Sequence, residues 1–576
     1  MSPSLFNGWT SWDDHVYVLN NQLIQHFSWE KLKAVFTTAH VNGTYSPLVL
    51  LSWALNHNLH GTSPFGYHFL NLALHVLNTL LVFVLVRKLS DNASIAFGTA
   101  LLFSIHPMNV EPVAWITGRK DVLYAFFTLT SLVLYTENVR TNSRKPFLFI
   151  ASLLVFLLAL LSKATAVILP ILIVLTDILF NRQPNKKMVL EKLPFFGLAV
   201  LFGGLAFYAQ SQTAALSEMH SASLIDSILA VGHSQLIYIL KVVAPFKLSA
   251  FHPYPNSLLS VTSIIGIVIW LLALIGGGLL FKRNGTSLIG FGILFFLTSI
   301  FPVSQIIPVG PAIVADRYAY VPYVGIFISL SAFVEFLVKK TSKMQVFVYP
   351  VCCCFILFLG LCSFNQAKTW KSDQTLWSNV IAHYPNCAKG YVNRGMYYTK
   401  MDDSKAALAD FQKALNIEPT MVELHQQMGL LNQRLGQYHN AQEAFNKAIE
   451  LNPFYEPARL NNALNYVYLN NRKMAISELT KLSDISPDYL LTYLNRGVLY
   501  EQYGAMTLAL ADYSKATELA PLDHRGFQYR AVLYYRIEAY GEALHDAARW
   551  VELKPTDPNA QKWLDKIRAT TNGLEK

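Results

Sequence analysis

The chain has 576 residues, of which 53% are hydrophobic and 14% are charged, and its net charge is +10 at pH 7. Soluble domains carry about 25% charged residues, so this composition excludes a wholly soluble protein. We find no basic, aromatic-interleaved patch of the nucleic-acid-binding kind, and the 5 cysteines form neither a disulfide framework nor a metal-ligand spacing. The apolar stretches end near Phe364, and a polar, tyrosine-rich part begins after Trp370. The sequence therefore predicts an integral membrane domain followed by a soluble one.

The first segment with unusual chemistry is GWTSWDDHVYVLNN, which places Asp13 and Asp14 side by side among aromatic residues. Adjacent aspartates before an aromatic run are most often a turn or a helix cap. In a loop outside the membrane, either carboxylate could instead serve as a general base. Spacing alone does not decide between these two interpretations.

Ten apolar stretches in the following part predict membrane-spanning helices, because many approach the roughly 20 residues that cross the hydrocarbon layer. They lie at 66–87, 93–107, 121–138, 147–162, 165–180, 193–209, 260–281, 286–303, 319–338 and 345–363. An eleventh stretch, 229–247, is moderately long and contains Pro245. We predict that it is re-entrant or interfacial, because the charge pattern of the loops closes only if this stretch does not cross fully.

Basic loops set the predicted orientation of these spans. Lysine and arginine recur in short loops on alternate sides of the spans, at 87–88, 140–145, 182–187, 282–283 and 339–343. The positive-inside rule makes these loops cytoplasmic. The residues before Gly66, the loop at 107–121 and the polar tail then lie on the opposite, outward side.

Several charged side chains stand out on that outward side. They are Glu111, Arg119 and Lys120 in HPMNVEPVAWITGRKD, Lys163 in LLSKATA, and Arg317 in ADRYAY. Charges at the mouth of a helix bundle cost free energy and are usually retained for a function. Each also has a structural explanation, either snorkelling of a cation to the interface or, for Arg317, a local ion pair with Asp316.

These carboxylates and cations together predict one kind of chemistry. A lipid-phosphate donor presents its phosphate at the headgroup level, where Arg and Lys could hold it and stabilise the charge that grows as it leaves. Asp13 or Asp14 would take the proton from an acceptor hydroxyl. Because phosphate leaves as a stable anion, no general acid is required. No histidine belongs to a recognised metal-binding motif, and we predict neither a metal nor a cofactor besides the donor.

The polar tail repeats with a period of 34 residues. Pro419, Pro453, Pro487, Pro521 and Pro555 keep this spacing, as do the small residues Gly395, Gly429, Ala463, Gly497 and Ala531. This is the tetratricopeptide period, with small residues where two helices meet and a proline ending the second helix. The sequence predicts five full repeats, a preceding half repeat that contains Pro385, and a final capping helix.

Read together, several segments resemble a known family. WDDHVYVLNN, HPMNVEPVAWITGRKDVL, LSKATAVILPILIVLTDIL and ADRYAYVPYVGIFI occur in the order seen in the TMTC (transmembrane and tetratricopeptide repeat-containing) protein O-mannosyltransferases and their bacterial relatives. The resemblance covers nearly the whole chain. It implies a glycosyltransferase of the GT-C superfamily, which uses polyprenyl-phosphate-linked sugars on the outer or lumenal side.

The resemblance also implies roles for individual residues. It places an acidic catalytic motif at Asp13 and Asp14, and it implies that the loop holding Glu111 and Arg119 arranges the donor or the acceptor. Members that use monophosphate-linked donors generally need no metal. Family members normally have an apolar span before the acidic motif, whereas here Asp13 follows only twelve residues after the start of the chain. We therefore expect an upstream segment that this sequence does not include.

We predict an all-α fold, a polytopic transmembrane bundle followed by a tetratricopeptide α-solenoid. The expected divisions are an outward acidic loop with interfacial helices (1–65), the membrane domain (66–364), a connecting half repeat (365–387), five repeats (388–555), and a capping helix and tail (556–576). The predicted location is a bacterial inner membrane or the endoplasmic reticulum, with the repeats and catalytic loops on the non-cytoplasmic side.

The predicted function is transfer of mannose or a related hexose from a polyprenyl-phosphate donor to protein Ser/Thr hydroxyls. Asp13 or Asp14 would act as the base. Glu111, Arg119, Lys120, Lys163 and Arg317 would bind the donor phosphate or the substrate. The expected partners are the membrane lipid-linked sugar and an acceptor polypeptide or partner protein bound by the repeats, without nucleic acid. The alternatives are a non-catalytic membrane-anchored scaffold and, less favoured because the spans show no paired halves, a transporter of a lipid-linked or anionic compound.

Overall fold

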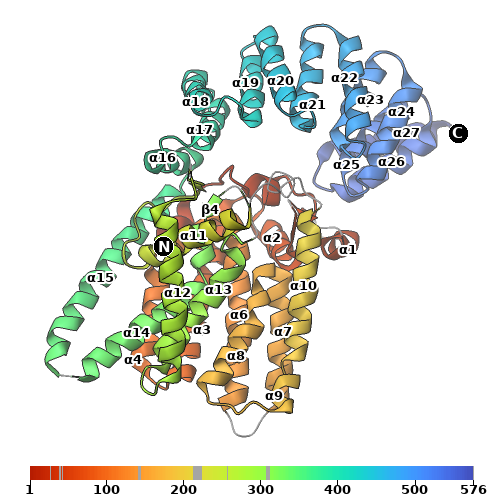
Figure 1. The fold of residues 1–576 in the computed structure, drawn as a ribbon. Helices are drawn as coiled ribbons and strands as arrows, with labels where there is room; N and C mark the ends of the chain where they lie inside the picture. The colour runs from red at the N-terminus through yellow and green to blue at the C-terminus, as the bar shows by residue number, and fades with distance from the viewer. Residues whose placement is uncertain are drawn as a thin grey trace. The chain divides into compact units, whose positions relative to one another are not determined.

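The protein is almost entirely helical in a computed structural model (Figure 1). The structure describes residues 1–25, 28–37, 40–41, 43–140, 145–211, 223–255, 257–306, 310, 312–340 and 342–574. The chain forms two compact units: unit 1 comprises Met1–Ile24 and Leu32–Pro385, and unit 2 comprises Gln25–Lys31 and Asn386–Lys576. The predicted all-α fold class is confirmed.

Residues 1–385 contain sixteen α-helices within their described parts. Their bounds are α1 Trp29–Thr37, α2 Pro47–His60, α3 Pro64–Ser90, α4 Ala93–Ile105, α5 Val110–Ala114, α6 Arg119–Arg140, α7 Pro146–Ser162, α8 Leu169–Leu179, α9 Lys186–Leu190, α10 Leu193–Ser211, α11 Leu224–Val243, α12 Val261–Lys282, α13 Ser287–Ile300, α14 Pro322–Lys340, α15 Ser342–Thr369 and α16 Asp373–His383. The described strands form two antiparallel pairs, β1 (His40–Val41) with β2 (Thr44–Tyr45) and β3 (His252–Pro253) with β4 (Ala312–Val314).

The membrane-spanning character of unit 1 follows from helix length and composition. Seven helical segments of the described chain are long and apolar enough to cross a membrane, and an eighth results if the bent pair Ala93–Ile105 and Pro107–Ala114 counts as one span. Three further apolar helices, Pro146–Ser162, Ala164–Leu179 and Ser287–Val303, are shorter. Each of the ten predicted stretches corresponds to one of these helices.

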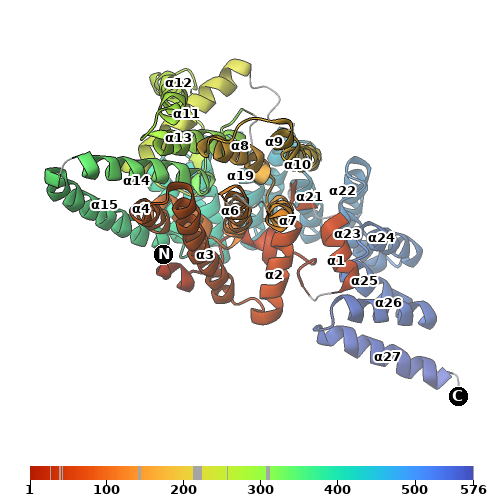
Figure 2. The same cartoon turned by 90° about the horizontal axis from the view of Figure 1, so that it is seen from below.

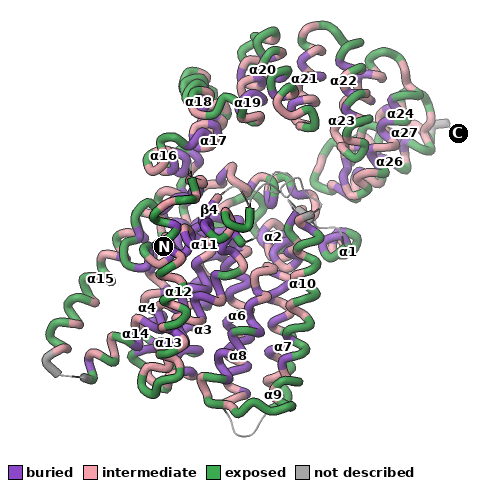
Figure 3. Tube along the Cα trace, viewed as in Figure 1, coloured by how far each residue is buried: buried purple, intermediate pink, exposed green. Residues whose placement is uncertain are grey.

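The centre of unit 1 is formed by α3, α4, α6 and α14, whereas α12 and α15 expose most of their apolar surface (Figure 3). Seen from below in Figure 2, α6 lies between α3 and α8. Close approach of α13 and α14 depends on glycine, since a Cβ on Gly292 would lie 2.3 Å from the carbonyl oxygen of Gly325. Small residues at such crossings let membrane helices pack without a hydrophobic driving force.

Several of the predicted basic segments lie together at one end of the bundle. At this end, Arg140, the last residue of α6, pairs with Asp91, which follows α3, and Asn92 donates to Glu335 of α14 at 2.8 Å. The short helix α9, which carries Lys186 and Lys187, lies at this same end (Figure 1). The opposite end carries the acidic segment, the 107–121 loop and the segment before α14. The predicted basic loops and the predicted outward segments are thus separated by the length of the bundle.

Helix α11 is long enough to cross, and its second half contacts the outward end of the bundle. Midway along α11, His233 lies 3.4 Å from Thr262, the second residue of α12. Near its end, Lys241 pairs with Asp316, just before α14. Both partners belong to the outward ends of their helices. The re-entrant or interfacial placement of 229–247 stays a prediction, because α11 is also one of the seven helices long and apolar enough to cross.

Unit 2 is a stack of helix pairs. Its helices are α17 Ala388–Lys400, α18 Ser404–Ile417, α19 Val422–Arg434, α20 Tyr438–Leu451, α21 Glu456–Tyr468, α22 Arg472–Ile485, α23 Leu490–Gln502, α24 Met506–Leu519, α25 His524–Arg536, α26 Tyr540–Leu553 and α27 Pro558–Leu574. In the first repeat, a Cβ on Gly395 would lie 2.5 Å from the Phe411 ring, and Gly497 has the same relation to Tyr513. The small residues of the period therefore lie where two helices meet, as predicted, and each faces a large ring.

The last helix closes the stack. Ile567 of α27 is fully buried in one cluster with Ala531, Ala543 and Ala547 of the fifth repeat. This packing covers the apolar face that the final repeat would otherwise expose, which is the role expected of a capping helix.

Candidate active site

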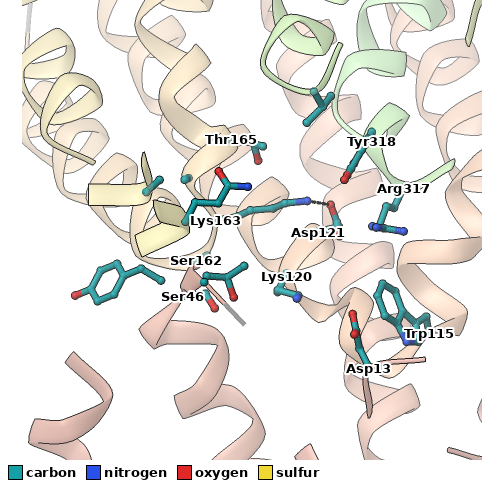
Figure 4. Close-up of a pocket in the computed structure, with 17 residues that line it drawn as sticks. Asp13, Ser46, Trp115, Lys120, Asp121, Ser162, Lys163, Thr165, Arg317 and Tyr318 are labelled. Carbon is teal, nitrogen blue, oxygen red and sulfur yellow. Dashed lines mark hydrogen bonds and ion pairs between the residues drawn. The ribbon is translucent and has the colours of Figure 1, made fainter. Parts of the chain in front are cut away.

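A cavity of about 310 Å³ opens at the outward end of unit 1. Its charged lining residues are Asp13, Lys120, Asp121, Lys163 and Arg317, and its aromatic ones include Tyr45, Trp115 and Tyr318. Figure 4 shows that these side chains come from separate segments of the chain and surround one space. Of the predicted site residues, Asp13, Lys120, Lys163 and Arg317 line this cavity. Sequence analysis did not include Asp121, Trp115 or Tyr318 among the site residues.

The two adjacent aspartates have different surroundings. Asp13 is partly exposed and lines the cavity. Asp14 is 1% exposed and accepts four hydrogen bonds: from the backbone N–H and the hydroxyl of Thr10 at 3.0 and 2.9 Å, and from those of Thr117 at 3.1 and 2.6 Å. It therefore fastens the acidic segment to the 107–121 loop. Of the two acids, only Asp13 lines the cavity, whereas Asp14 anchors the segment that carries both.

Burial changes the acidity of Asp14. Loss of solvation raises the pKa of its carboxyl to about 6, although hydrogen bonds from Thr117 and Thr10 act in the opposite direction. A buried carboxylate held by neutral donors costs free energy when it is ionised. Asp14 does not line the cavity, and its raised pKa predicts that the acidic segment responds to pH.

Arg317 is held by a buried carboxylate and two aromatic rings. Glu111, which is 2% exposed, accepts from the backbone N–H of Arg317 at 2.9 Å and from its Nη1 at 2.5 Å. The guanidinium lies 5.2 Å from the ring centroid of Trp115 and 5.0 Å from that of Tyr318. Burial opposes the charged form, but the ion pair with Glu111 raises the pKa of Arg317 above its ordinary value. Glu111 therefore positions Arg317 and stabilises its charged form, but Glu111 does not itself line the cavity.

A second cation, Lys163, is set by Asp121. The Lys163 Nζ lies 2.5 Å from Oδ1 of Asp121, whose side chain is 3% exposed. Lys163 is the cap residue after α7, and Asp121 belongs to the first turn of α6, so the pair joins two helix ends at the cavity. In the sequence, Asp121 is visible as the last residue of GRKD. The distance along the chain between Asp121 and Lys163 does not identify Lys163 as its partner.

Lys120 and Arg119 are neighbours that face different ways. The Lys120 Nζ lies 3.8 Å from the centroid of the Tyr17 ring, and its side chain lines the cavity. Arg119 is fully buried and is not among the cavity-lining residues. The predicted substrate-binding role of Arg119 is therefore not supported by its position.

The guanidinium of Arg119 instead ties together α2, α3 and α6. It donates to the side chain of Asn71, to Oδ1 of Asn56 at 3.0 Å, to the carbonyl oxygen of Tyr67 at 2.9 Å and to Oγ of Ser52 at 3.3 Å. These acceptors use four of the N–H directions of the side chain, which leaves it poorly placed to bind a phosphate. Arg119 is therefore a buried structural residue that does not line the cavity.

Asp316 has partners other than the predicted local pair with Arg317. Its Oδ1 lies 2.7 Å from Nζ of Lys241 and 3.0 Å from Nε2 of His252, and the backbone N–H of Ser249 donates to Oδ2 at 3.2 Å. Burial opposes ionisation, but Lys241 lowers the pKa of Asp316 below its ordinary range. Arg317 therefore pairs with Glu111 and not with Asp316. The contacts of Asp316 hold the start of the segment that carries Arg317.

The described residues include no group of three or more His, Cys, Asp and Glu side chains that could hold a metal ion. The predicted lack of a metal and of a cofactor stays a prediction.

Comparison with known proteins finds two family matches. Residues 45–208 match the family described as dolichyl-phosphate-mannose-protein mannosyltransferase. Residues 388–421 and 422–455 match the tetratricopeptide repeat. The first match includes the cavity-lining residues Trp115, Lys120, Asp121 and Lys163, whereas Asp13 and Arg317 lie outside it.

Curated relatives resemble most of this chain. The protein O-mannosyl-transferase F38B6.6 of Caenorhabditis elegans is 24% identical over 71% of this chain and 60% of its own length. The human protein O-mannosyl-transferase TMTC3 is 24% identical over 74% of this chain and 51% of its own length. This chain thus spans between half and two thirds of these two relatives.

Among solved structures, YrrB, described as a TPR protein with an unusual peptide-binding site, is 19% identical with a TM-score of 0.26, covering 32% of this chain and 96% of its own.

The resemblance expected from the sequence is confirmed: this chain joins a mannosyltransferase-family membrane segment to tetratricopeptide repeats, and its curated relatives are protein O-mannosyltransferases of the TMTC type.

Proposed function

We propose that unit 1 transfers mannose or a related hexose from a polyprenyl-phosphate donor to Ser or Thr hydroxyls of a polypeptide. The observation that carries this proposal is the cavity at the outward end, where the carboxylate of Asp13 shares one space with the cations Lys120, Lys163 and Arg317. The membrane mannosyltransferase match over residues 45–208 supports the same reaction class.

The donor phosphate binds to the cations. A sugar linked to a polyprenyl phosphate carries one negative charge on its phosphodiester, and this group sits at the headgroup level. Arg317 offers a rigid planar guanidinium, and Lys163 a mobile ammonium. Both are already paired with carboxylates, Glu111 and Asp121, so the free cavity has little net charge. The cations therefore stay in place before the donor arrives and need no rearrangement when charge develops.

In the transfer step, the acceptor hydroxyl oxygen forms a bond to the anomeric carbon of the sugar. The bond between that carbon and the phosphate oxygen breaks, and its electron pair leaves with the polyprenyl phosphate. Asp13 takes the hydroxyl proton as a general base. The leaving phosphate gains a second negative charge, which Arg317, Lys163 and Lys120 stabilise. Atoms and charges balance without an added acid.

We infer the sidedness of the reaction from the separation of the two ends. Basic loops lie at the end opposite the cavity, and by the positive-inside rule this arrangement supports a cavity on the non-cytoplasmic side, facing a periplasm or an endoplasmic reticulum lumen. The last membrane helix ends at Thr369, and the carbonyl of Lys371 accepts from the N–H of Gly8 at 3.0 Å. The chain therefore leaves the last membrane helix beside the acidic segment. On this basis the repeats belong to the same compartment, where they bind the acceptor polypeptide.

The test is a transfer assay with the purified full chain. Polyprenyl-phosphate-linked radiolabelled mannose and a Ser/Thr peptide are the substrates, and Asp13→Asn is the variant. We expect transfer to fall by about 10²- to 10⁴-fold, the usual contribution of a general base. Asp402→Asn is the matched control, because Asp402 is an exposed acid in the first repeat paired with Arg434. Transfer that survives Asp13→Asn would exclude Asp13 as the base. If the wild-type chain transfers no label from any donor, the scaffold alternative replaces the enzyme.

A further inference from the structure

The segment between the membrane bundle and the repeats contacts three walls of the cavity. We call residues 367–384 the α16 segment; it contains the end of α15, the helix α16 and Tyr384. All of it belongs to unit 1. Neither the proposed chemistry nor the repeat fold accounts for these contacts.

The first wall is the acidic segment. The backbone N–H of Ser11 donates to Oδ1 of Asp373 at 2.7 Å, two residues before Asp13. Upstream, the side chain of Asn7 donates to the carbonyl oxygen of Ala367 at 3.2 Å. Asp373 is 6% exposed, so its bond to Ser11 is shielded from water. This wall depends on a short, charge-assisted hydrogen bond, which is a strong one.

Aromatic packing strengthens the same wall. The Trp12 ring lies edge-on to Trp377 of α16, with centroids 5.1 Å apart, and Trp377 is fully buried. Trp377 occupies the repeat position of Phe411, 34 residues earlier. In the first repeat, Phe411 packs against Gly395 of the preceding helix. The half repeat has no preceding repeat helix, and the acidic segment takes that place beside Trp377.

The other two walls are the 107–121 loop and the segment before α14. The Trp370 ring stacks on Trp115, with centroids 5.9 Å apart, and Trp115 lines the cavity. The Tyr384 hydroxyl lies 2.7 Å from Nδ1 of His252, whose Nε2 lies 3.0 Å from Asp316. Asp316 directly precedes Arg317. The α16 segment thus reaches the proposed base from its start and a phosphate-binding cation from its end.

We propose that the α16 segment is the positioning element of the cavity, with Asp373 setting the place of Asp13 and Tyr384 setting that of Arg317. This inference rests on the proposed function for its kinetic part. Because the first repeat follows Pro385 directly, the segment is also the covalent link through which a change in the repeats would reach the reacting groups.

The two contacts predict effects on different kinetic constants, kcat for Asp373 and the donor KM for Tyr384. Asp373→Ala removes the acceptor for Ser11 and releases the base, so we expect kcat to fall about tenfold with the donor KM unchanged. Asp373→Asn keeps an acceptor oxygen and should restore kcat to within about twofold of wild type. Tyr384→Phe loosens the Arg317 side, and we expect the donor KM to rise about threefold while kcat changes little. A purely structural role would not separate KM from kcat in this way.

A matched control removes an equivalent bond elsewhere. Asp403 accepts from the backbone N–H of Ala406 at 3.0 Å in the first repeat, so Asp403→Ala loses the same kind of contact away from the cavity. We expect both constants to stay at wild-type values with a short acceptor peptide. If Asp403→Ala lowers kcat as much as Asp373→Ala does, the position of the bond does not matter and the inference is wrong.

Hydrogen exchange tests the same contacts without relying on catalysis. In the purified full chain, we expect exchange of the backbone N–H groups of residues 8–14 to accelerate about tenfold in Asp373→Ala and to remain near wild type in Asp373→Asn. Unchanged exchange in Asp373→Ala would show that α16 does not hold the acidic segment. Faster exchange with unchanged kcat would show that this order is not needed. Absence of transfer in the wild-type chain overturns the proposed function alone, because exchange still decides the contact.

Discussion

Arg317 at the cavity and Arg496 in the fourth repeat have the same immediate surroundings. Each pairs with a buried carboxylate, Glu111 at 2.5 Å and Asp512 at 2.8 Å. Each also lies between two aromatic rings, 5.2 and 5.0 Å away for Arg317 and 5.6 and 5.9 Å away for Arg496. The difference is in what lies beyond the pair. Only Arg317 of these two lines a described cavity.

The sequence separation of the partners explains this difference. Arg496 and Asp512 are 16 residues apart, as are Arg394 and Asp410 in the first repeat, so the pair joins the two helices of one repeat. Arg317 and Glu111 are 206 residues apart and join two loops of the bundle. A local pair stabilises a module, whereas a distant pair sets the relative place of segments that together enclose a space. The same chemistry therefore serves stability in one region and a site in the other.

The largest expected effect separates the two arginines by activity. Arg317→Ala should lower kcat/KM for the donor by about 10²- to 10³-fold, because it removes a preorganised charge from the leaving phosphate. Arg496→Ala should leave kcat/KM for the donor unchanged when the acceptor is a short peptide. The measurement is initial-rate kinetics of the purified full chain. Equal losses in both variants, or a loss below threefold in Arg317→Ala, would contradict the contrast.

Asp14 offers a pH test of the cavity end that no repeat residue should reproduce. Its carboxyl has a folded pKa of about 6, raised by burial above the ordinary value of 3.8. The folded state therefore binds the proton more tightly, and this stabilisation is complete below about pH 4. It is lost as the pH rises through 6, which corresponds to a decrease of about 3 kcal/mol in the free energy of unfolding.

Asp14→Asn removes this titration. We expect the thermal midpoint of the wild-type chain to fall relative to that of Asp14→Asn between pH 4 and 6.5, measured in detergent by a thermal-shift assay. Asp512→Asn, which alters a buried acid in a repeat, provides the comparison. A constant difference between wild type and Asp14→Asn across this range would show that the buried carboxyl does not titrate there.

The contribution of the Arg496–Asp512 pair to stability can be tested by substituting the residues that another repeat has at these positions. At the positions of Arg496 and Asp512, the second repeat has Met428 and Ala444. Arg496→Met alone leaves Asp512 buried without its cation, and we expect a loss of about 2 kcal/mol. The double variant Arg496→Met, Asp512→Ala should cost less than about 1 kcal/mol, since neither group remains unpaired.

The measurement is hydrogen exchange over residues 490–519 of the full chain, which reports the local free energy of opening. Donor kinetics should be unchanged in both variants. If the double variant opens as easily as the single one, the ion pair itself, and not the unpaired acid, provides the stability.

The smallest expected effect compares two lysines over aromatic rings. Lys120 lies 3.8 Å from the Tyr17 ring and lines the cavity, whereas Lys566 of the capping helix lies 4.6 Å from the rings of Tyr535 and Trp563. We expect Lys120→Met to raise the donor KM about threefold and Lys566→Met to leave it unchanged. An unchanged donor KM in Lys120→Met would remove Lys120 from the phosphate-binding cations.

Periodic features were predictable from the sequence, and distant pairings were not. The repeats follow from the 34-residue period, and the spans follow from uninterrupted apolar length. The charged segments near the cavity were also grouped together from the sequence, and their side of the membrane stays a prediction. These signals are local or periodic, so they survive without knowledge of the packing.

The sequence did not predict which of the charged residues face the cavity. Asp13 and Asp14 differ only in the side chains that reach them, and Thr117 is 103 residues from Asp14. In the sequence, Arg119 and Lys120 are equally good candidates for binding substrate. In the structure, the guanidinium of Arg119 donates its hydrogen bonds to polar groups of α2 and α3. Asp316 pairs with Lys241, which sits in a helix with no sequence relation to it. Such partners are chosen by tertiary packing, which a single sequence does not display.

The contact between Trp12 and Trp377 gives the protein a label-free optical reporter. Two indoles in edge-on contact couple their absorption, so they contribute a circular-dichroism band that disappears when they separate. The chain has 10 tryptophans, and subtracting the spectrum of Trp377→Phe isolates the pair. The seating of the amino-terminal segment could then be followed during donor or peptide titrations in native, unmodified protein.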